Sequence, residues 1–89
     1  MKFEFEKAFV RDFKKLKSKE LASAISEAIK QVSDASTLSE INNLKKLSGY
    51  KSAFRIRIGD YRIGFELLNK TTIRFIIIAH RKDIYKIFP

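Results

Sequence analysis

The chain of 89 residues has no cysteine, no tryptophan, one proline and a single histidine, His80. Without cysteine there can be no disulfide framework, thiolate zinc site or cysteine nucleophile. One histidine excludes a multi-histidine metal site. The longest apolar run, Phe75–Ala79, is far shorter than the roughly 18 residues of a membrane helix. The N-terminus alternates charges with aromatics and lacks the apolar block of a signal peptide, so we expect a cytoplasmic protein that does not bind membranes.

Positive charge is what the chain has in excess, with 19 Lys and Arg against 10 Asp and Glu. Residues 1–50 contain ten basic and seven acidic side chains, whereas residues 51–89 contain nine basic and three acidic ones. This concentration favours a polyanionic partner, or an acidic protein that covers the basic region. A basic surface that serves solubility alone stays an alternative. The apolar content of 45% is that of one globular domain, which we place over residues 1–89.

The first half of the chain is predicted to form a strand followed by two helices. Residues 2–6 alternate between charged and aromatic side chains, as a half-buried strand does. Apolar residues at helical spacing then predict a helix from Ala8 to Leu16 and a second one that Ser18 caps. Their short connection predicts a helical hairpin. Residues 38–52 suggest a short helical turn and a packed connection.

The second half is predicted to form three strands and a short helix. Residues 54–58 and 61–67 alternate around a Gly-Asp loop, and residues 72–79 form a strand that is buried on both faces. A terminal helix is expected to turn Ile84, Ile87 and Phe88 inward. The predicted fold class is therefore α+β, in the order β-α-α-β-β-β. It has a mainly antiparallel four-stranded sheet, with the helical hairpin packed on one face and the short helix at the C-terminus.

The register of the predicted hairpin brings arginines together. If Gly59 and Asp60 form the loop, Arg57 pairs with Arg62 and Arg55 with Gly64, and all three arginines share the sheet face away from the helices. Like charges opposite one another destabilise a strand pair, so stability alone does not explain this arrangement. Three guanidiniums around a glycine favour an anion site, and Arg is a better phosphate ligand than Lys. A solvated face, with Glu66 relieving the repulsion, stays the alternative.

The C-terminal segment adds further candidates. Arg81 and Tyr85 are four residues apart, which predicts that they lie on the same side of the terminal turn and helix. Tyr85 either belongs to the core or stacks on a nucleobase. His80 is a candidate for proton transfer, although a structural role at a strand end is the alternative. Lys51, Lys82 and Lys86 extend the basic region as possible RNA contacts, or are ordinary surface lysines.

Three segments together resemble the RelE/ParE superfamily, the toxins of bacterial type II toxin–antitoxin modules. They are Leu44–Gly49, Phe54–Ile63 and His80–Tyr85. The resemblance extends over essentially the whole chain, including the N-terminal strand and helical hairpin. It implies a cognate antitoxin as partner and, for RelE-like members, cleavage of mRNA in the ribosomal A site with neither a metal ion nor an organic cofactor.

In that reaction the 2′-hydroxyl attacks its own phosphodiester. The resemblance places Arg55, Arg57, Arg62, Arg81 and Tyr85 at the positions of the family's site residues. Family members often have lysine in the strand pair that is Arg55 and Arg57 here, and arginine cannot act as a conventional base. The alternatives are that Lys51 or His80 takes that part, or that catalysis rests on electrostatics and positioning alone. Two alternatives stay open: a ParE-like inhibitor of DNA gyrase with the same fold, and a basic binding module with weak or no catalysis that serves antitoxin complex formation and operon autoregulation.

Overall fold

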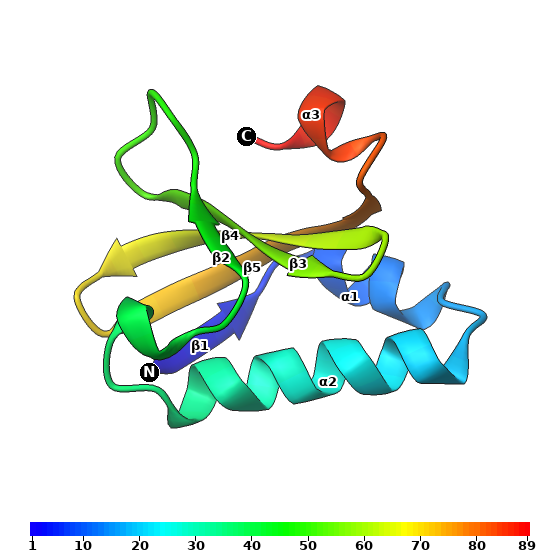
Figure 1. The fold of residues 1–89 in the computed structure, drawn as a ribbon, viewed down its shortest axis with the longest axis horizontal. Coiled ribbons are helices and arrows are strands. Elements are labelled where there is room, and N and C mark those ends of the chain that lie inside the picture. Colours follow the sequence, from blue (N-terminus) through cyan, green and yellow to red (C-terminus); the bar gives the residue numbers. More distant parts are fainter.

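The computed structural model describes residues 1–89 as an α+β fold in which helices cover both faces of one sheet (Figure 1). The elements in chain order are β1 (Lys2–Phe5), α1 (Lys7–Lys14), α2 (Lys19–Asp34), a 3-10 turn (Leu38–Glu40), β2 (Leu44–Lys46), β3 (Ala53–Ile58), β4 (Tyr61–Asn69), β5 (Thr72–His80) and α3 (Ile84–Ile87). None of the helices is both long and apolar enough to cross a lipid bilayer.

The sheet has five strands in the order β1-β5-β4-β3-β2, and it is mixed. β1 pairs with β5 in parallel, and the other three pairings are antiparallel. The prediction of four mainly antiparallel strands was therefore wrong in number. The additional strand is β2, in the segment for which a helical turn was expected. Leu44 and Leu47 are three residues apart, a spacing that fits a helix but also places two side chains on opposite faces of extended backbone. Leu44 packs against the main core, and Leu47 lies in a second cluster on the opposite face of the sheet.

The β3–β4 hairpin confirms the predicted register. Arg57 pairs with Arg62, and Arg55 pairs with Gly64. Gly59 adopts a positive φ of 58° in the two-residue turn, a conformation that glycine enters without a side-chain clash. The three arginines therefore share one face of the sheet.

A bulge in β5 changes which of its side chains face the helices. Phe65 pairs with Phe75, whereas Gly64 pairs with Ile77, so Ile76 is an extra residue in the strand. Ile78 therefore joins the same core as Phe75, and its amide donates to Asp12 Oδ2 of α1 at 3.2 Å. As predicted, β5 lies inside the sheet, with apolar residues packed on both faces.

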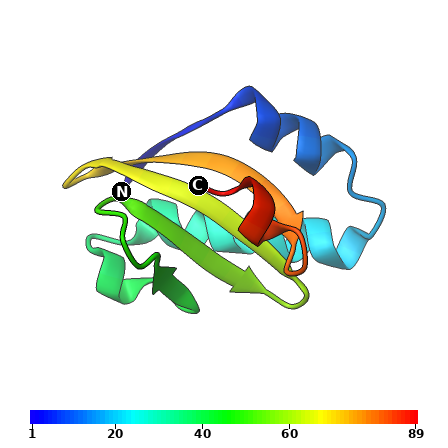
Figure 2. The same cartoon turned by 90° about the horizontal axis from the view of Figure 1, so that it is seen from above.

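The helices α1 and α2 pack against the same core on one side of the sheet, as the predicted helical hairpin requires. Figure 2 shows α2 crossing behind the strands and α1 beside them. Ser18 caps α2, since its Oγ accepts a hydrogen bond from Leu21 N at 3.1 Å. The main core lies between this face and the two helices. It includes Phe9, Ile25, Val32, Ile56, Ile63, Phe65, Ile73, Phe75 and Ile78.

The opposite side of the sheet, called the outer face below, is partly covered by the C-terminal segment (Figure 1). Ile84 and Phe88 are buried in a second cluster with Leu47 and Ala79. Ile87 was predicted to point inward, but half of its surface is exposed, because a helix of one turn turns only part of its circumference to the sheet. The C-terminal segment thus stands over the same face as the arginines.

Candidate functional site

The outer face carries a basic hollow of about 160 Å³. It lies over β2, β3 and β4, and α3 borders it on one side. Its lining residues are Asn43, Lys45, Arg55, Arg57, Arg62 and Tyr85. Four of the six are cationic at neutral pH and none is acidic, which is the composition of a site for a phosphate or another anion.

The arginines of the basic hollow have no acidic partner. None of Arg55, Arg57 and Arg62 takes part in an ion pair, and the expected relief by Glu66 is not seen. Arg74, near the other end of the outer face, differs: its Nε donates to Glu4 Oε1 at 2.6 Å. That hydrogen bond raises the pKa of Arg74 above its ordinary value. The charge of Arg74 is thus neutralised by acidic partners, whereas the charges of the three arginines in the basic hollow are not.

Two guanidiniums of the site are held in defined places. Nη1 of Arg62 donates to the carbonyl oxygens of Gly59 and Tyr61 at 2.9 and 2.8 Å, which fixes this side chain against the hairpin turn. The guanidinium carbon of Arg55 lies 4.8 Å from the centroid of the Tyr85 ring, a cation–π contact. Such restraints orient donors before a ligand arrives and lower the entropy lost on binding.

Tyr85 is exposed, with 75% of its surface accessible, so the alternative that it belongs to the core is wrong. Its neighbours in the C-terminal segment hold it in place: Ile84 is 1% exposed, and Phe88 packs on the backbone of Gly64. We expected Gly64 to admit an anion, but the space above it is filled by the Phe88 ring. The glycine is needed because it lets the tail that carries Tyr85 dock.

A second hollow, of about 300 Å³, adjoins the first and shares Lys45, Arg55 and Tyr85 with it. It extends to the β2–β3 loop, where Tyr50 is 52% exposed. Two exposed tyrosines therefore flank a continuous basic groove. Aromatic faces beside cations are what single-stranded nucleic acid uses for base stacking and phosphate contacts.

Four exposed residues that sequence reasoning proposed, Lys51, Arg81, Lys82 and Lys86, do not line the basic hollow. Lys51 is in the β2–β3 loop, Lys82 is in the turn before α3, and Lys86 is in α3. Arg81 is fixed to the tip of the β3–β4 hairpin: its backbone N donates to Asp60 O at 2.7 Å, and its Nε lies 3.9 Å from Asp60 Oδ1. This ion pair is long and exposed, so it leaves the Arg81 charge available.

His80 lies apart from the arginines. It pairs in register with Tyr61, and the two rings meet edge to face at 5.4 Å between centroids. Tyr61 packs against the main core, so His80 is on the side of the sheet that faces the helices. Its Nδ1 accepts a hydrogen bond from Lys82 N at 3.1 Å. The structure therefore brings Arg55, Arg57, Arg62 and Tyr85 together and separates His80 from them.

Sequence reasoning missed three residues of the groove: Asn43, Lys45 and Tyr50. Lys45 stands opposite Arg55 in the β2–β3 pairing. No local signal marked this strand, because residues 44–47 read Leu-Lys-Lys-Leu and do not alternate. The three-residue spacing of leucines favoured a helical turn instead.

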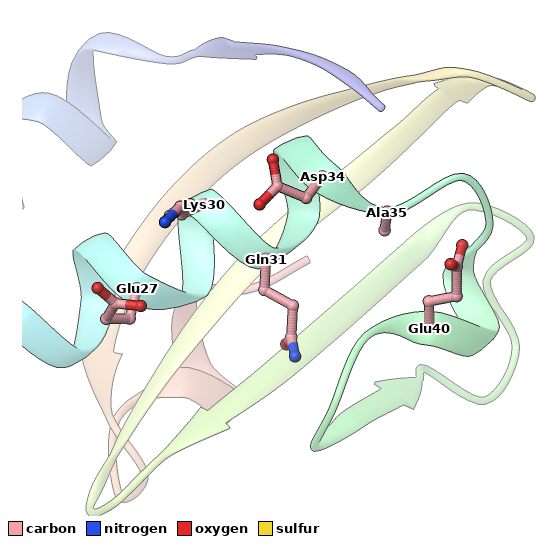
Figure 3. A pocket seen from close by; sticks show the side chains of 6 residues that line it. All are labelled: Glu27, Lys30, Gln31, Asp34, Ala35 and Glu40. Carbon is pink, nitrogen blue, oxygen red and sulfur yellow. The ribbon is translucent and has the colours of Figure 1, made fainter.

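The hollow at the C-terminal end of α2 has a different character (Figure 3). It has a volume of about 370 Å³, and its charged side chains, Glu27, Lys30, Asp34 and Glu40, come from separate turns and do not converge. Glu40 accepts hydrogen bonds from the amides of Thr37 and Ser36, which lower its pKa. Nowhere does the chain gather three potential metal ligands, so this hollow is no candidate metal site.

Comparison with known proteins finds relatives over the whole fold. The family model of the ParE toxin of type II toxin–antitoxin systems, parDE, matches residues 3–85. Toxin RelE3 of Methanocaldococcus jannaschii is 39% identical over 90 residues, which covers 100% of each chain.

Solved structures agree with these matches. The RelB–RelE antitoxin–toxin complex of Methanococcus jannaschii matches with a TM-score of 0.78 and 38% identity, over 96% of this chain and 98% of that one. The archaeal RelE–RelB complex of Pyrococcus horikoshii matches with a TM-score of 0.72 over 90% and 93% of the two chains. Its 20% identity makes that a likeness of fold.

Proposed function

This chain belongs to the RelE/ParE superfamily of type II toxins, and we propose that it is a ribosome-dependent mRNA endonuclease that acts without a metal ion. The observation that carries the proposal is the convergence of Arg55, Arg57, Arg62 and Tyr85 on one hollow that contains no carboxylate. A phosphodiester supplies the negative charge that this hollow lacks, and an adjacent base supplies a ring for the exposed tyrosine.

The proposed chemistry is attack by a 2′-hydroxyl on the neighbouring phosphorus, which leaves a 2′,3′-cyclic phosphate. The transition state carries more charge on the phosphoryl oxygens than the ground state does. Arg55, Arg57 and Arg62 donate hydrogen bonds to those oxygens, and they need no reorganisation because their acidic competitors are absent. Removal of one such donor typically lowers the rate by about 10²–10³-fold.

Tyr85 has a positioning part in this proposal. Its ring is exposed on the groove side of α3, and Arg55 already contacts it. A base stacked there turns the ribose so that the 2′-oxygen lies in line with the scissile bond. The exposed Arg81, Lys51, Lys82 and Lys86 are assigned to binding of the flanking RNA and ribosome. His80 has no part in the step, because it lies on the helix-facing side.

The cognate antitoxin is the second partner that we propose, since the similar RelE chains were solved as complexes with RelB. An apolar hollow of about 410 Å³ lies between α1, α2 and β1. Its lining includes Phe5, Phe9, Val10, Phe13 and Ile29. A helix or extended segment of the antitoxin that places apolar side chains there, and acidic ones over the basic groove, would silence the toxin.

The decisive test of the function is a brief induction of the chain without its antitoxin, followed by primer extension on cellular mRNA. We expect cuts inside translated codons, which disappear when the start codon of the reporter mRNA is mutated. Arg57→Gln should abolish the cuts. Arg11→Gln, with the same loss of charge on α1, should keep them.

Inhibition of DNA gyrase is the second candidate function, because the matching family model is that of ParE. Growth arrest with intact mRNA and impaired DNA supercoiling would establish it in place of the nuclease. Absence of both arrest and cuts would instead establish a binding module that serves antitoxin complex formation and operon autoregulation.

A further inference from the structure

Lys45 is the only lysine among the residues that line the basic hollow. It lies on β2, directly opposite Arg55 in register, and it lines both adjoining hollows. The start of β2 is tied to β3, because Arg57 N donates to Asn43 O at 3.1 Å. Asn43 has a positive φ of 61°, which asparagine tolerates better than most residues. The backbone of β2 is therefore fixed beside β3, and the Lys45 side chain lines the same hollow as the arginines.

The three arginines of the hollow cannot serve as proton donors. Arginine does not deprotonate in proteins, so Arg55, Arg57 and Arg62 can bind charge but cannot transfer a proton. Tyr85 also has an exchangeable proton, but its ring contacts the Arg55 guanidinium and is assigned to base stacking in the proposed function. His80 lies on the other face of the sheet. Among the cations of this hollow, only the ammonium of Lys45 has a proton that it can transfer.

We propose that Lys45 is a further catalytic residue, which donates a proton to the leaving 5′-oxygen; this inference rests on the endonuclease function proposed above. The 2′-oxygen forms a bond to phosphorus while the bond from phosphorus to the 5′-oxygen breaks. The proton of the 2′-hydroxyl passes to water, and a proton of Lys45 Nζ passes to the 5′-oxygen. The neutral amine then regains a proton from solvent, so atoms and charge balance.

The experiment uses ribosomes programmed with a synthetic mRNA that is cut at one position. One substrate carries the natural oxygen at the leaving group and the other carries sulfur there, because a thiolate leaves without protonation. General acid catalysis typically contributes about 10²–10⁴-fold. On the oxygen substrate we expect Lys45→Gln and Lys45→Arg to be at least about 10²-fold slower than wild type. On the sulfur substrate both should come within a few-fold of wild type.

The matched control is Lys46→Gln on the neighbouring position of β2. Lys46 pairs with Phe54 on the opposite side of the strand and lines neither hollow. This variant should cut both substrates like wild type. Retained antitoxin binding by all variants shows that they are folded.

Two results would overturn the inference while leaving the nuclease intact. Full activity of Lys45→Arg would mean that charge alone matters. Equal slowing of Lys45→Gln on both substrates would mean that Lys45 binds RNA without proton transfer. If wild type cuts neither substrate, the proposed function itself fails.

Discussion

The packing of Phe88 on Gly64 yields a quantitative prediction about how the tail that carries Tyr85 is held. A Cβ added at Gly64 would lie 2.7, 2.8 and 3.0 Å from three ring atoms of Phe88, closer than real carbon contacts allow. Phe88 is 6% exposed, so a displaced ring loses its packing in the second cluster. Overpacking of this kind costs about 1–3 kcal/mol. We therefore expect Gly64→Ala to lower the free energy of unfolding by about 2 kcal/mol.

The C-terminal tail can detach from the sheet, and this limits the destabilisation that Gly64→Ala can cause. The destabilisation cannot exceed the contribution of the docked side chains of the tail, about 1.5–3 kcal/mol for each fully buried one. A loss of about 2 kcal/mol lowers Tm by about 8–16 °C in a domain of this size. In a Phe88→Ala background the ring is absent, so Gly64→Ala should cost nothing or should stabilise slightly, since alanine is the less flexible residue.

A double-mutant cycle measured by urea or thermal unfolding isolates this contact. We expect a coupling energy of about 2 kcal/mol between Gly64 and Phe88, from the overpacking range. Gly64→Ala should also reduce RNA cleavage while every cation of the groove is retained, because Tyr85 loses its support. An equal cost of Gly64→Ala with and without the Phe88 ring would refute the reasoning.

Two further predictions concern the helices and their connections. Ser18→Ala removes the oxygen that accepts from Leu21 N and should cost about 1 kcal/mol in urea unfolding, whereas Ser18→Asp should retain the cap. The amides of Thr37 and Ser36 hold the pKa of Glu40 below its ordinary 4.5, so Glu40 contributes its full stability above that pH and loses it as the pH falls towards the lowered value. The stability advantage of wild type over Glu40→Gln should therefore be full at neutral pH and shrink as the pH falls below 4.5 in chemical unfolding, and an advantage independent of pH would contradict the assignment.

Local sequence signals sufficed for the hairpin that builds the site. The Gly59-Asp60 turn and the alternation on both sides of it determine the register, and the register places Arg55, Arg57 and Arg62 on one face. The cap at Ser18 is equally local. These elements could be predicted because the residues that determine them are adjacent in the chain.

Features that depend on contacts between distant segments could not be predicted in the same way. β2 has three residues, too few to show an alternation, so Lys45 was missed. Nothing near β1 in the sequence indicates its parallel pairing with β5. The bulge at Ile76 shifts the alternation of β5 by one residue, and this shift turns His80 towards the helices. Each of these features is set by tertiary packing rather than by local propensity.

The contrast between Arg74 and the arginines of the basic hollow explains how one sheet face serves both stability and function. Arg74 is neutralised by Glu4 and Glu6, whose oxygens lie 2.6 and 3.4 Å from its guanidinium nitrogens. Arg57 and Arg62 face one another with no carboxylate near, an arrangement that costs stability. A bound phosphate would remove that repulsion. We therefore expect an anion such as sulfate to raise the Tm of wild type more than that of Arg57→Gln.

The most direct test of the central claim is the chemistry of the RNA ends that the purified chain produces on programmed ribosomes. The account predicts a 2′,3′-cyclic phosphate at the cut from wild type, and the same product from the control Arg11→Gln. Arg57→Gln should form it about 10²–10³-fold more slowly. Unchanged cutting by Arg57→Gln, or an intact mRNA with wild type, would contradict the assignment of the basic hollow as the site of RNA cleavage.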